Sequence, residues 1–157
     1  MPNDQANTST NPFLSSAAKI LIADDNTHGV ELLEAYLSNT DWQIRTAMNG
    51  EEALKSIQDW LPDVVLLDVM MPRLSGFEVC KRLRSDTRTH GIGVIMITAL
   101  DQTSDIDRAV EAGTDDFLTK PINQAELLLR ITALLKSRSS TDELSRTLDY
   151  IGNVEEG

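Results

Sequence analysis

Five polar side chains stand directly after short apolar runs of this chain, and their types could act together. Asp24 and Asp25 follow the first run, while Asp68, Thr98 and Lys120 follow the third, fourth and fifth. Three carboxylates brought together repel one another, so such a site needs a cation or the Lys120 ammonium to compensate the charge. Since every ligand would be an oxygen atom, the set favours a hard ion and indicates Mg²⁺.

The apolar runs that precede these side chains predict β-strands. They span residues 19–23, 43–47, 64–67, 94–97 and 117–118. The third and fourth runs are apolar at every position, which is typical of strands covered on both faces and therefore of a parallel sheet. In such sheets the active crevice lies at the carboxyl ends of the strands. The five polar side chains are therefore expected on one rim.

The segments between the runs predict helices, because each carries one apolar stripe at helical spacing. Three of them begin with a cap residue followed three positions later by glutamate, which is a helix start signal. These pairs are Ser75 and Glu78, Asn49 and Glu52, and Asn123 and Glu126. The fourth segment has the stripe Ile106, Ala109 and Val110. A strand followed by a helix, five times over, predicts an α/β fold with a doubly wound five-stranded parallel sheet.

Composition restricts the function classes further. The chain has 157 residues, with 41% hydrophobic and 25% charged residues, so it contains enough apolar side chains for a core. Its net charge of −11 disfavours binding to nucleic acid or to an anionic membrane surface. Cys80 is its only cysteine, which excludes an intramolecular disulfide and a multi-cysteine zinc site. With no apolar run of membrane-spanning length and no signal-peptide pattern, a cytoplasmic location is expected.

Three regions are expected along the chain. Residues 1–18 are rich in Asn, Thr, Ser and Pro without periodicity, and predict a flexible tail. Residues 19–138 hold the strands and helices. In residues 139–157 a stripe of Leu144, Leu148 and Ile151 predicts a helical linker or signalling helix. This stripe is compatible with a separate helix, with an extension of the preceding C-terminal helix into a coiled coil, or with a tail that folds back.

Four motifs together resemble the receiver domain of two-component response regulators. They are KILIADD at residues 19–25, LLDVMMPRLSGF at 66–77, ITA at 97–99 and FLTKP at 117–121. The resemblance covers about residues 19–138 and implies a flavodoxin-like (βα)5 fold, to which the stripe in residues 139–157 would add an extended C-terminal helix. The motifs are most similar to those of receivers that precede second-messenger enzymes such as diguanylate cyclases, so an output domain outside this chain is an expectation.

The resemblance implies a role for each polar residue of the rim. Asp68 would be the phosphoacceptor, taking a phosphoryl group from a histidine kinase, a phosphotransfer protein or a small phosphodonor. Asp25 and Asp68 would hold Mg²⁺ directly, Asp24 would act through a water, and the backbone carbonyl of Met70 would complete the shell. Lys120 would place a second positive charge on the phosphoryl oxygens.

The same resemblance implies how phosphorylation becomes a signal. The Thr98 hydroxyl would bind the phosphoryl group, and Phe117 would move into the space that Thr98 leaves. The change would bias the face formed by the fourth helix, the fifth strand and the fifth helix, and a homodimer could form there or through the C-terminal helix. The peptide bond between Lys120 and Pro121 is expected to be cis, because proline makes that form accessible.

Two positions are expected to tune the lifetime of the phosphoryl group. Met70 and Leu100 lie two residues beyond Asp68 and Thr98. Both are apolar, so neither offers a hydrogen bond to hold the hydrolytic water, and slow self-dephosphorylation is expected.

Three other interpretations compete with the phosphoacceptor. Asp24 or Asp25 could merely cap the following helix. A haloacid-dehalogenase-like hydrolase would need a second aspartate two residues after the nucleophile, where this chain has Met70. A pseudo-receiver, which would be a protein-interaction module independent of phosphorylation, predicts loss of an acid, the threonine or the lysine, and none is lost. The chain is therefore expected to catalyse only its own phosphorylation and dephosphorylation.

Overall fold

A computed structural model of the chain describes residues 17–99 and 103–138. Apart from its last two residues, the predicted tail at 1–18 lies outside the described residues. The predicted helical segment at 139–157 and Leu100 also lie outside them. No helix in the part of the chain that the structure describes is long and apolar enough to cross a membrane.

The strands form one parallel sheet in the order β2-β1-β3-β4-β5, so that β1 and β3 lie side by side near its centre. This arrangement confirms the predicted doubly wound sheet, with each strand within one residue of its predicted bounds. The strands are β1 (Lys19–Ala23), β2 (Gln43–Ala47), β3 (Val64–Asp68), β4 (Gly93–Thr98) and β5 (Asp116–Thr119). Every residue of β3 and β4 is buried, as expected of strands covered on both faces.

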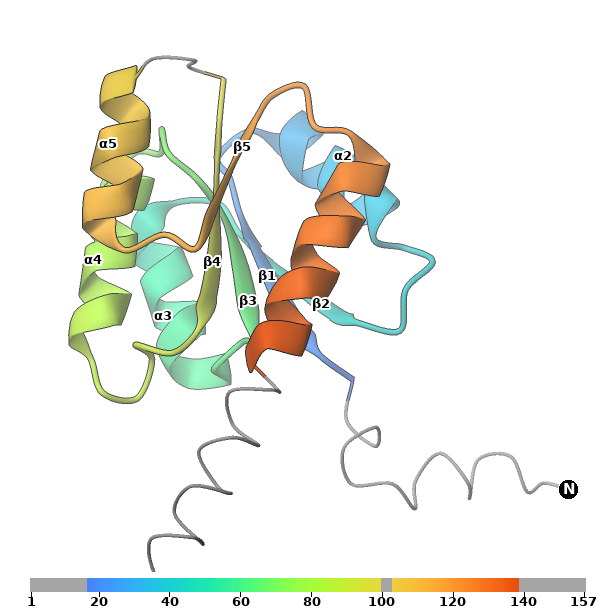
Figure 1. Cartoon of the computed structure of the whole chain (residues 1–157), viewed down its shortest axis with the longest axis horizontal. Helices are drawn as coiled ribbons and strands as arrows, with labels where there is room; N and C mark the ends of the chain where they lie inside the picture. Colours follow the sequence, from blue (N-terminus) through green and yellow to red (C-terminus); the bar gives the residue numbers. More distant parts are fainter. Residues whose placement is uncertain (1–16, 100–102, 139–157) are drawn as a thin grey trace, which may run out of the picture.

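Helices cover both faces of the sheet (Figure 1). One face carries α3 (Gly50–Trp60), α4 (Gly76–Ser85) and α5 (Thr103–Ala112). The other carries α2 (Thr27–Tyr36) and the C-terminal helix, residues 124–138. The three predicted start signals are confirmed, because the side chains of Asn49, Ser75 and Asn123 each accept a hydrogen bond from the backbone N–H three residues on.

Alternation along the strands separates the core into two layers. In β1, Leu21 faces the α3–α5 side, and its neighbours Ile20 and Ile22 face the side of α2 and the C-terminal helix. Strand β3 divides in the same way, with Leu67 in the first layer and Leu66 in the second. Both layers are largely aliphatic, so the sheet is fixed in place by apolar contacts on each face.

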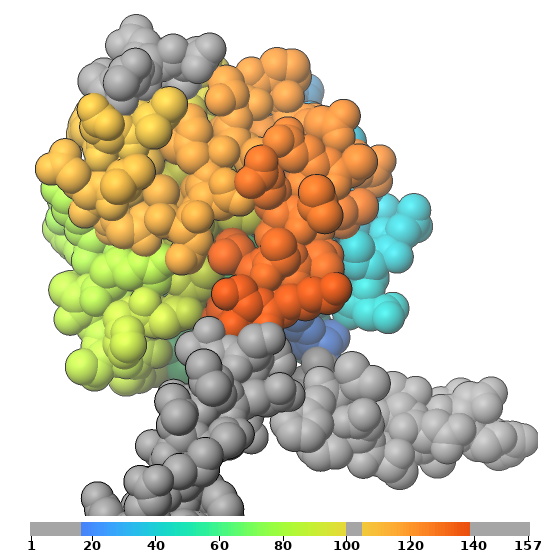
Figure 2. Space-filling view, in the orientation of Figure 1, coloured from blue at the N-terminus to red at the C-terminus, as the bar shows by residue number. Residues whose placement is uncertain are grey.

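The predicted stripe of α5 was only partly right. Ala109 is fully buried, whereas Ile106 is 40% exposed and Val110 is 66% exposed. Helix α5 lies toward the edge of the sheet that ends with β5, and its buried surface consists of small residues such as Ala109 and Ala112. In the space-filling view α5 and the C-terminal helix lie on the visible face, next to α4 in green (Figure 2). The larger apolar side chains of α5 are therefore left partly in solvent.

Candidate functional site

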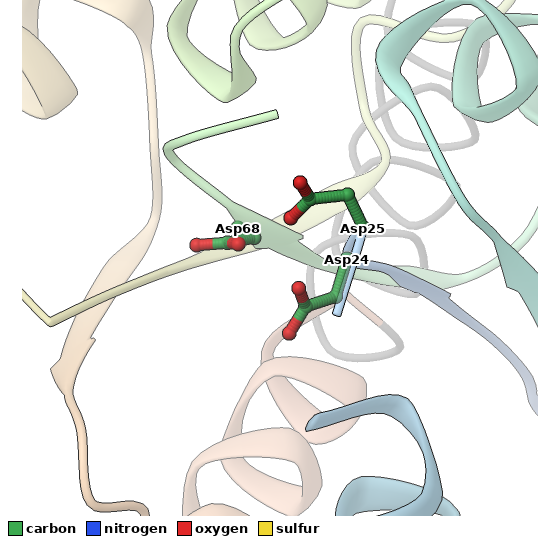
Figure 3. Close-up of side chains that lie close together, drawn as sticks. All are labelled: Asp24, Asp25 and Asp68. Carbon is green, nitrogen blue, oxygen red and sulfur yellow. The ribbon is translucent and has the colours of Figure 1, made fainter. Parts of the chain in front are cut away.

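The carboxyl ends of β1 and β3 bring three carboxylates together. Asp24 and Asp25 follow β1 directly, and Asp68 is the last residue of β3. One carboxylate oxygen from each lies within 4.8 Å of the others, and Figure 3 shows the three side chains around one small space. Asp24 and Asp68 are buried while Asp25 is exposed. The polar rim expected from the sequence therefore has a carboxylate cluster at its centre.

Asp24 is held by the start of α2. Its carboxylate accepts a hydrogen bond of 2.9 Å from the backbone N–H of Asn26. Asn26 in turn caps α2, because its side chain accepts from the backbone N–H of Gly29. A Cβ atom at Gly29 would lie 2.6 Å from an Asp24 oxygen, so glycine leaves room for that carboxylate. The competing interpretation, in which Asp24 or Asp25 merely caps this helix, is contradicted, because Asn26 is the cap residue.

The backbone around Asp68 is equally restricted. The N–H of Val69 donates to the carbonyl of Ile97 in β4, and the N–H of Gly76 donates to the carbonyl of Val69. A Cβ atom at Gly76 would stand 2.3 Å from the Asp68 carbonyl oxygen. The start of α4 therefore passes so close to the end of β3 that only glycine fits, and the approach fixes the loop that follows Asp68.

Lys120 brings a positive charge to the same space. Its backbone N–H donates to the carbonyl of Thr98 at 2.8 Å, which fixes the segment after β5 against the end of β4. Its ammonium nitrogen lies 3.5 Å from an oxygen of Asp24 and 3.9 Å from an oxygen of Asp68. The peptide bond between Lys120 and Pro121 is cis. One cation thus faces three carboxylates, and the cluster keeps an excess of negative charge.

This excess of negative charge helps to raise the pKa of Asp68. Burial and the neighbouring charge of Asp24 raise the pKa of Asp68 from its ordinary 3.8 to about 7. A hydrogen bond that protonated Asp68 donates to Asp24 acts in the same direction, while Lys120 and a hydrogen bond from the backbone of Met70 partly offset the rise. Oxygen ligands, burial and uncompensated negative charge are what a hard divalent cation requires, so the residues present fit Mg²⁺.

The remaining predicted residues surround this cluster. Thr98 is fully buried at the end of β4, and half-buried Phe117 pairs with Met96 across the sheet. Thr98 lies two residues beyond Met96, so strand alternation places both side chains on the same face of β4. Because Met96 and Phe117 belong to the α3–α5 layer, Thr98 lies on the side of the sheet that Phe117 faces. The side chain of Met70 is 64% exposed beside Asp68.

A comparison with known families assigns this arrangement. Residues 20–132 match the family described as the response regulator receiver domain. The chain belongs to this family. Receiver domains are phosphoacceptors that bind Mg²⁺ at an acidic pocket. In this chain Asp24, Asp25 and Asp68 form an acidic cluster.

Individual relatives agree with the family match. Response regulator PleD of Caulobacter vibrioides is 44% identical over 128 residues, which make up 82% of this chain and 28% of PleD. The alkaline phosphatase synthesis transcriptional regulatory protein PhoP of Bacillus subtilis is 42% identical over 118 residues, 75% of this chain and 48% of PhoP. The chain thus spans less than half of the length of these curated relatives.

A solved structure shows the same fold. The signal receiver domain of a signal transduction histidine kinase from Syntrophus aciditrophicus is 34% identical, with a TM-score of 0.73, over 77% of this chain and 92% of that one. The flavodoxin-like fold predicted from the motifs is therefore confirmed for this receiver.

Two contacts of the elements around the site could not be predicted from the sequence. Asn26 follows the acid pair and caps α2, but the residue three positions on is Gly29 rather than glutamate, so no capping box marked it. Arg108 of α5 places its guanidinium 4.2 Å from the ring centre of Phe77, at the start of α4. Nothing in the spacing of the chain signals this contact, which needs the two helices side by side.

Proposed function

We propose that Asp68 is the phosphoacceptor of this receiver and that a histidine kinase or phosphotransfer protein is its donor. A carboxylate oxygen of Asp68 attacks the phosphorus of a phosphohistidine, the P–N bond breaks, and the imidazole leaves with the bonding electron pair and takes up a proton. The product is an aspartyl phosphate. The ionised carboxylate needs no general base for this attack.

The observation that carries the proposal is the position of Asp68 beside the Lys120 ammonium and within the carboxylate cluster. It ends β3, is 7% exposed, and lies 3.9 Å from the Lys120 ammonium and within the carboxylate cluster. The ammonium can contact the oxygens of a phosphoryl group on Asp68, where it would offset the developing negative charge. Lys120 is thus assigned to charge stabilisation rather than to proton transfer.

Asp24, Asp25 and Asp68 are the residues that would hold Mg²⁺, with Asp24 acting through a water and the backbone carbonyl of Met70 completing the shell. The ion supplies positive charge to the transferring phosphoryl oxygens when it is bound. The support for this assignment is the oxygen-only donor set and the excess negative charge that Lys120 leaves uncompensated.

Thr98 and Phe117 are assigned to the switch. Their shared face of the sheet and their neighbouring places in β4 and β5 support the idea that movement of one changes the space open to the other. The affected surface would consist of α5, β5 and the C-terminal helix, through which a homodimer or an output domain could respond.

The proposed receiver unit spans residues 19–138, with a tail at 1–18 and a linker or signalling helix at 139–157. Its chemistry would be limited to its own phosphorylation and dephosphorylation. The exposed Met70 side chain offers no hydrogen bond to a hydrolytic water, so a long-lived phosphoryl group is expected, and Leu100 is assigned to the same effect.

Intact-mass measurement after incubation with Mg²⁺ and acetyl phosphate tests the assignment of Asp68. The wild-type chain should gain one phosphoryl group, and Asp68→Asn should gain none. Asp59→Asn is the matched control, because Asp59 is an exposed acid on α3 far from the rim, and it should react like wild type. Equal phosphorylation of Asp68→Asn would refute the proposal, as would continuous phosphate release without a trapped adduct.

A further inference from the structure

The hydroxyl of Tyr36 joins helix α2 to the segment that carries Lys120. It donates a hydrogen bond of 3.1 Å to the backbone carbonyl of Ile122, although the two residues are 86 positions apart. In the return direction, the side-chain amide of Gln124 donates to the backbone carbonyl of Tyr36 at 3.1 Å. Two hydrogen bonds therefore tie the last turn of α2 to the chain directly after Pro121.

The tie matters because packing alone leaves space between these two parts. A cavity of about 260 Å³ lies between α2 and the segment after β5. Its apolar lining includes Leu32 and Leu33 on one side and Pro121 and Ile122 on the other. Leu33 and Ile122 are packed in the same core layer, but the cavity beside them leaves part of this boundary without side-chain contacts. The hydrogen bond from the Tyr36 hydroxyl to the Ile122 carbonyl fixes the distance between α2 and this segment.

The segment from Lys120 to Ile122 is thereby held at both ends. At its start, the Lys120 N–H donates to the carbonyl of Thr98 in β4. At its end, the Ile122 carbonyl accepts from Tyr36 while the Ile122 side chain is buried in the core. The start of α2 also holds Asp24, through the N–H of Asn26. Helix α2 therefore helps to position both the Asp24 carboxylate and the segment that carries Lys120.

We propose that Tyr36 is a positioning residue for Lys120, an inference that rests on the proposed role of Lys120 in phosphoryl transfer. By fixing the Ile122 carbonyl relative to α2, the Tyr36 hydroxyl keeps the Lys120 ammonium at 3.5 Å from Asp24 and 3.9 Å from Asp68. Without the hydroxyl, the segment can move away from α2 and the ammonium spends less time over the carboxylates. Tyr36 touches none of the reacting atoms itself.

Tyr36→Phe removes only the hydroxyl, and its effect is read as the rate of phosphorylation by acetyl phosphate with Mg²⁺. The rate should fall about fivefold, as expected for one hydrogen bond. In a Lys120→Met background, Tyr36→Phe should change the rate no further. Ser38→Ala is the matched control, because the Ser38 hydroxyl donates to the Ala35 carbonyl at the same end of α2 and leaves the Lys120 segment untouched. An equal slowing in both backgrounds would overturn the inference, since it would show a general structural effect.

A second measurement does not depend on phosphorylation. Reductive methylation followed by peptide mass mapping reports how freely Lys120 reacts, with exposed Lys55 as an internal reference. Tyr36→Phe should raise the relative labelling rate of Lys120 several-fold, while Ser38→Ala should leave it unchanged. An unchanged Lys120 rate in Tyr36→Phe would overturn the inference. If the wild-type chain takes up no phosphoryl group, the proposed function fails, and the labelling rates still decide the role of Tyr36.

Discussion

The protonation of Asp68 links its proposed role to the stability of the domain. Because its pKa is about 7 in the folded chain and 3.8 ordinarily, the folded state holds a proton that the unfolded state releases between these values. Stability from this group is therefore fully present below about pH 4 and is lost as the pH rises through 7. At pH 8 without metal, the ionised and buried Asp68 destabilises the fold.

Asp68→Asn should consequently stabilise the metal-free domain at pH 8 by about 2 kcal/mol, because it removes a buried charge beside Asp24. At pH 5, which is closer to the ordinary pKa of 3.8, the same change should stabilise the domain less. Urea denaturation of both proteins at the two pH values measures this difference. Exposed Asp59→Asn serves as the control. An equal change in the free energy of unfolding at pH 5 and pH 8 would contradict the explanation.

Gly76 illustrates a backbone constraint at the same scale. Gly76→Ala should destabilise the domain by about 3 kcal/mol, because its Cβ would lie 2.3 Å from the Asp68 carbonyl oxygen and the backbone must shift. Gly91→Ala is the matched control, since a Cβ there meets nothing within 4 Å, and it should change the free energy of unfolding by at most about 0.5 kcal/mol. Similar denaturant midpoints for the two variants would disprove this reading of the contact.

At the scale of elements, one arginine joins the ends of several helices and strands. The guanidinium of Arg84, on α4, donates to the carbonyls of Gly113, His90 and Ile92 and to the carboxylate of Asp115. These partners lie at the end of α5, before β4 and before β5. The side chain is 21% exposed, so the carbonyls would be poorly hydrated without it. Arg84 therefore fixes where α4 and α5 end against the sheet.

Arg84→Met should cost about 2 kcal/mol of unfolding free energy, because several partly buried acceptors lose their donor. Arg82→Met on the same helix is the comparison. Arg82 forms an ion pair with Glu78, and the two side chains are 56% and 44% exposed, so its loss should cost at most about 0.5 kcal/mol. Chemical denaturation gives both values. If the two variants lost equal stability, the Arg84 contacts would not be holding these elements together.

The elements themselves were largely predictable from sequence, because strand runs, helix stripes and cap pairs are local signals. The rim residues were also predictable, since each lies at or just beyond the carboxyl end of a strand. Arg84 and Tyr36 were not, because their partners are backbone carbonyls on other elements and any residue can supply a carbonyl. The exposure of Val110 was missed for a similar reason, since its stripe resembles a buried one and only the edge position of α5 leaves it in solvent.

For the whole molecule, the carboxylate cluster predicts a stabilisation by Mg²⁺ that depends on pH. At a concentration one hundred times the dissociation constant, the ion should add about 2.7 kcal/mol to the free energy of unfolding at pH 8. The increment should shrink below pH 7, because binding requires the ionised form of Asp68. Asp25→Asn should abolish it while leaving the metal-free stability nearly unchanged, because Asp25 is exposed. Denaturation with and without Mg²⁺ measures the increment, and its persistence in Asp25→Asn would contradict the assigned ligand.

The amino ends of the strands, opposite the acidic rim, bring the two ends of the described chain together. Asp63, just before β3, accepts a hydrogen bond from the backbone N–H of Lys19 and forms an ion pair of 3.7 Å with Arg138. The described chain thus begins and ends at the amino ends of the strands, away from the loops that carry the carboxylates (Figure 1). The two ends of the described chain therefore lie next to each other, since Lys19 and Arg138 contact the same aspartate, and a partner that approaches the acidic rim meets neither of them.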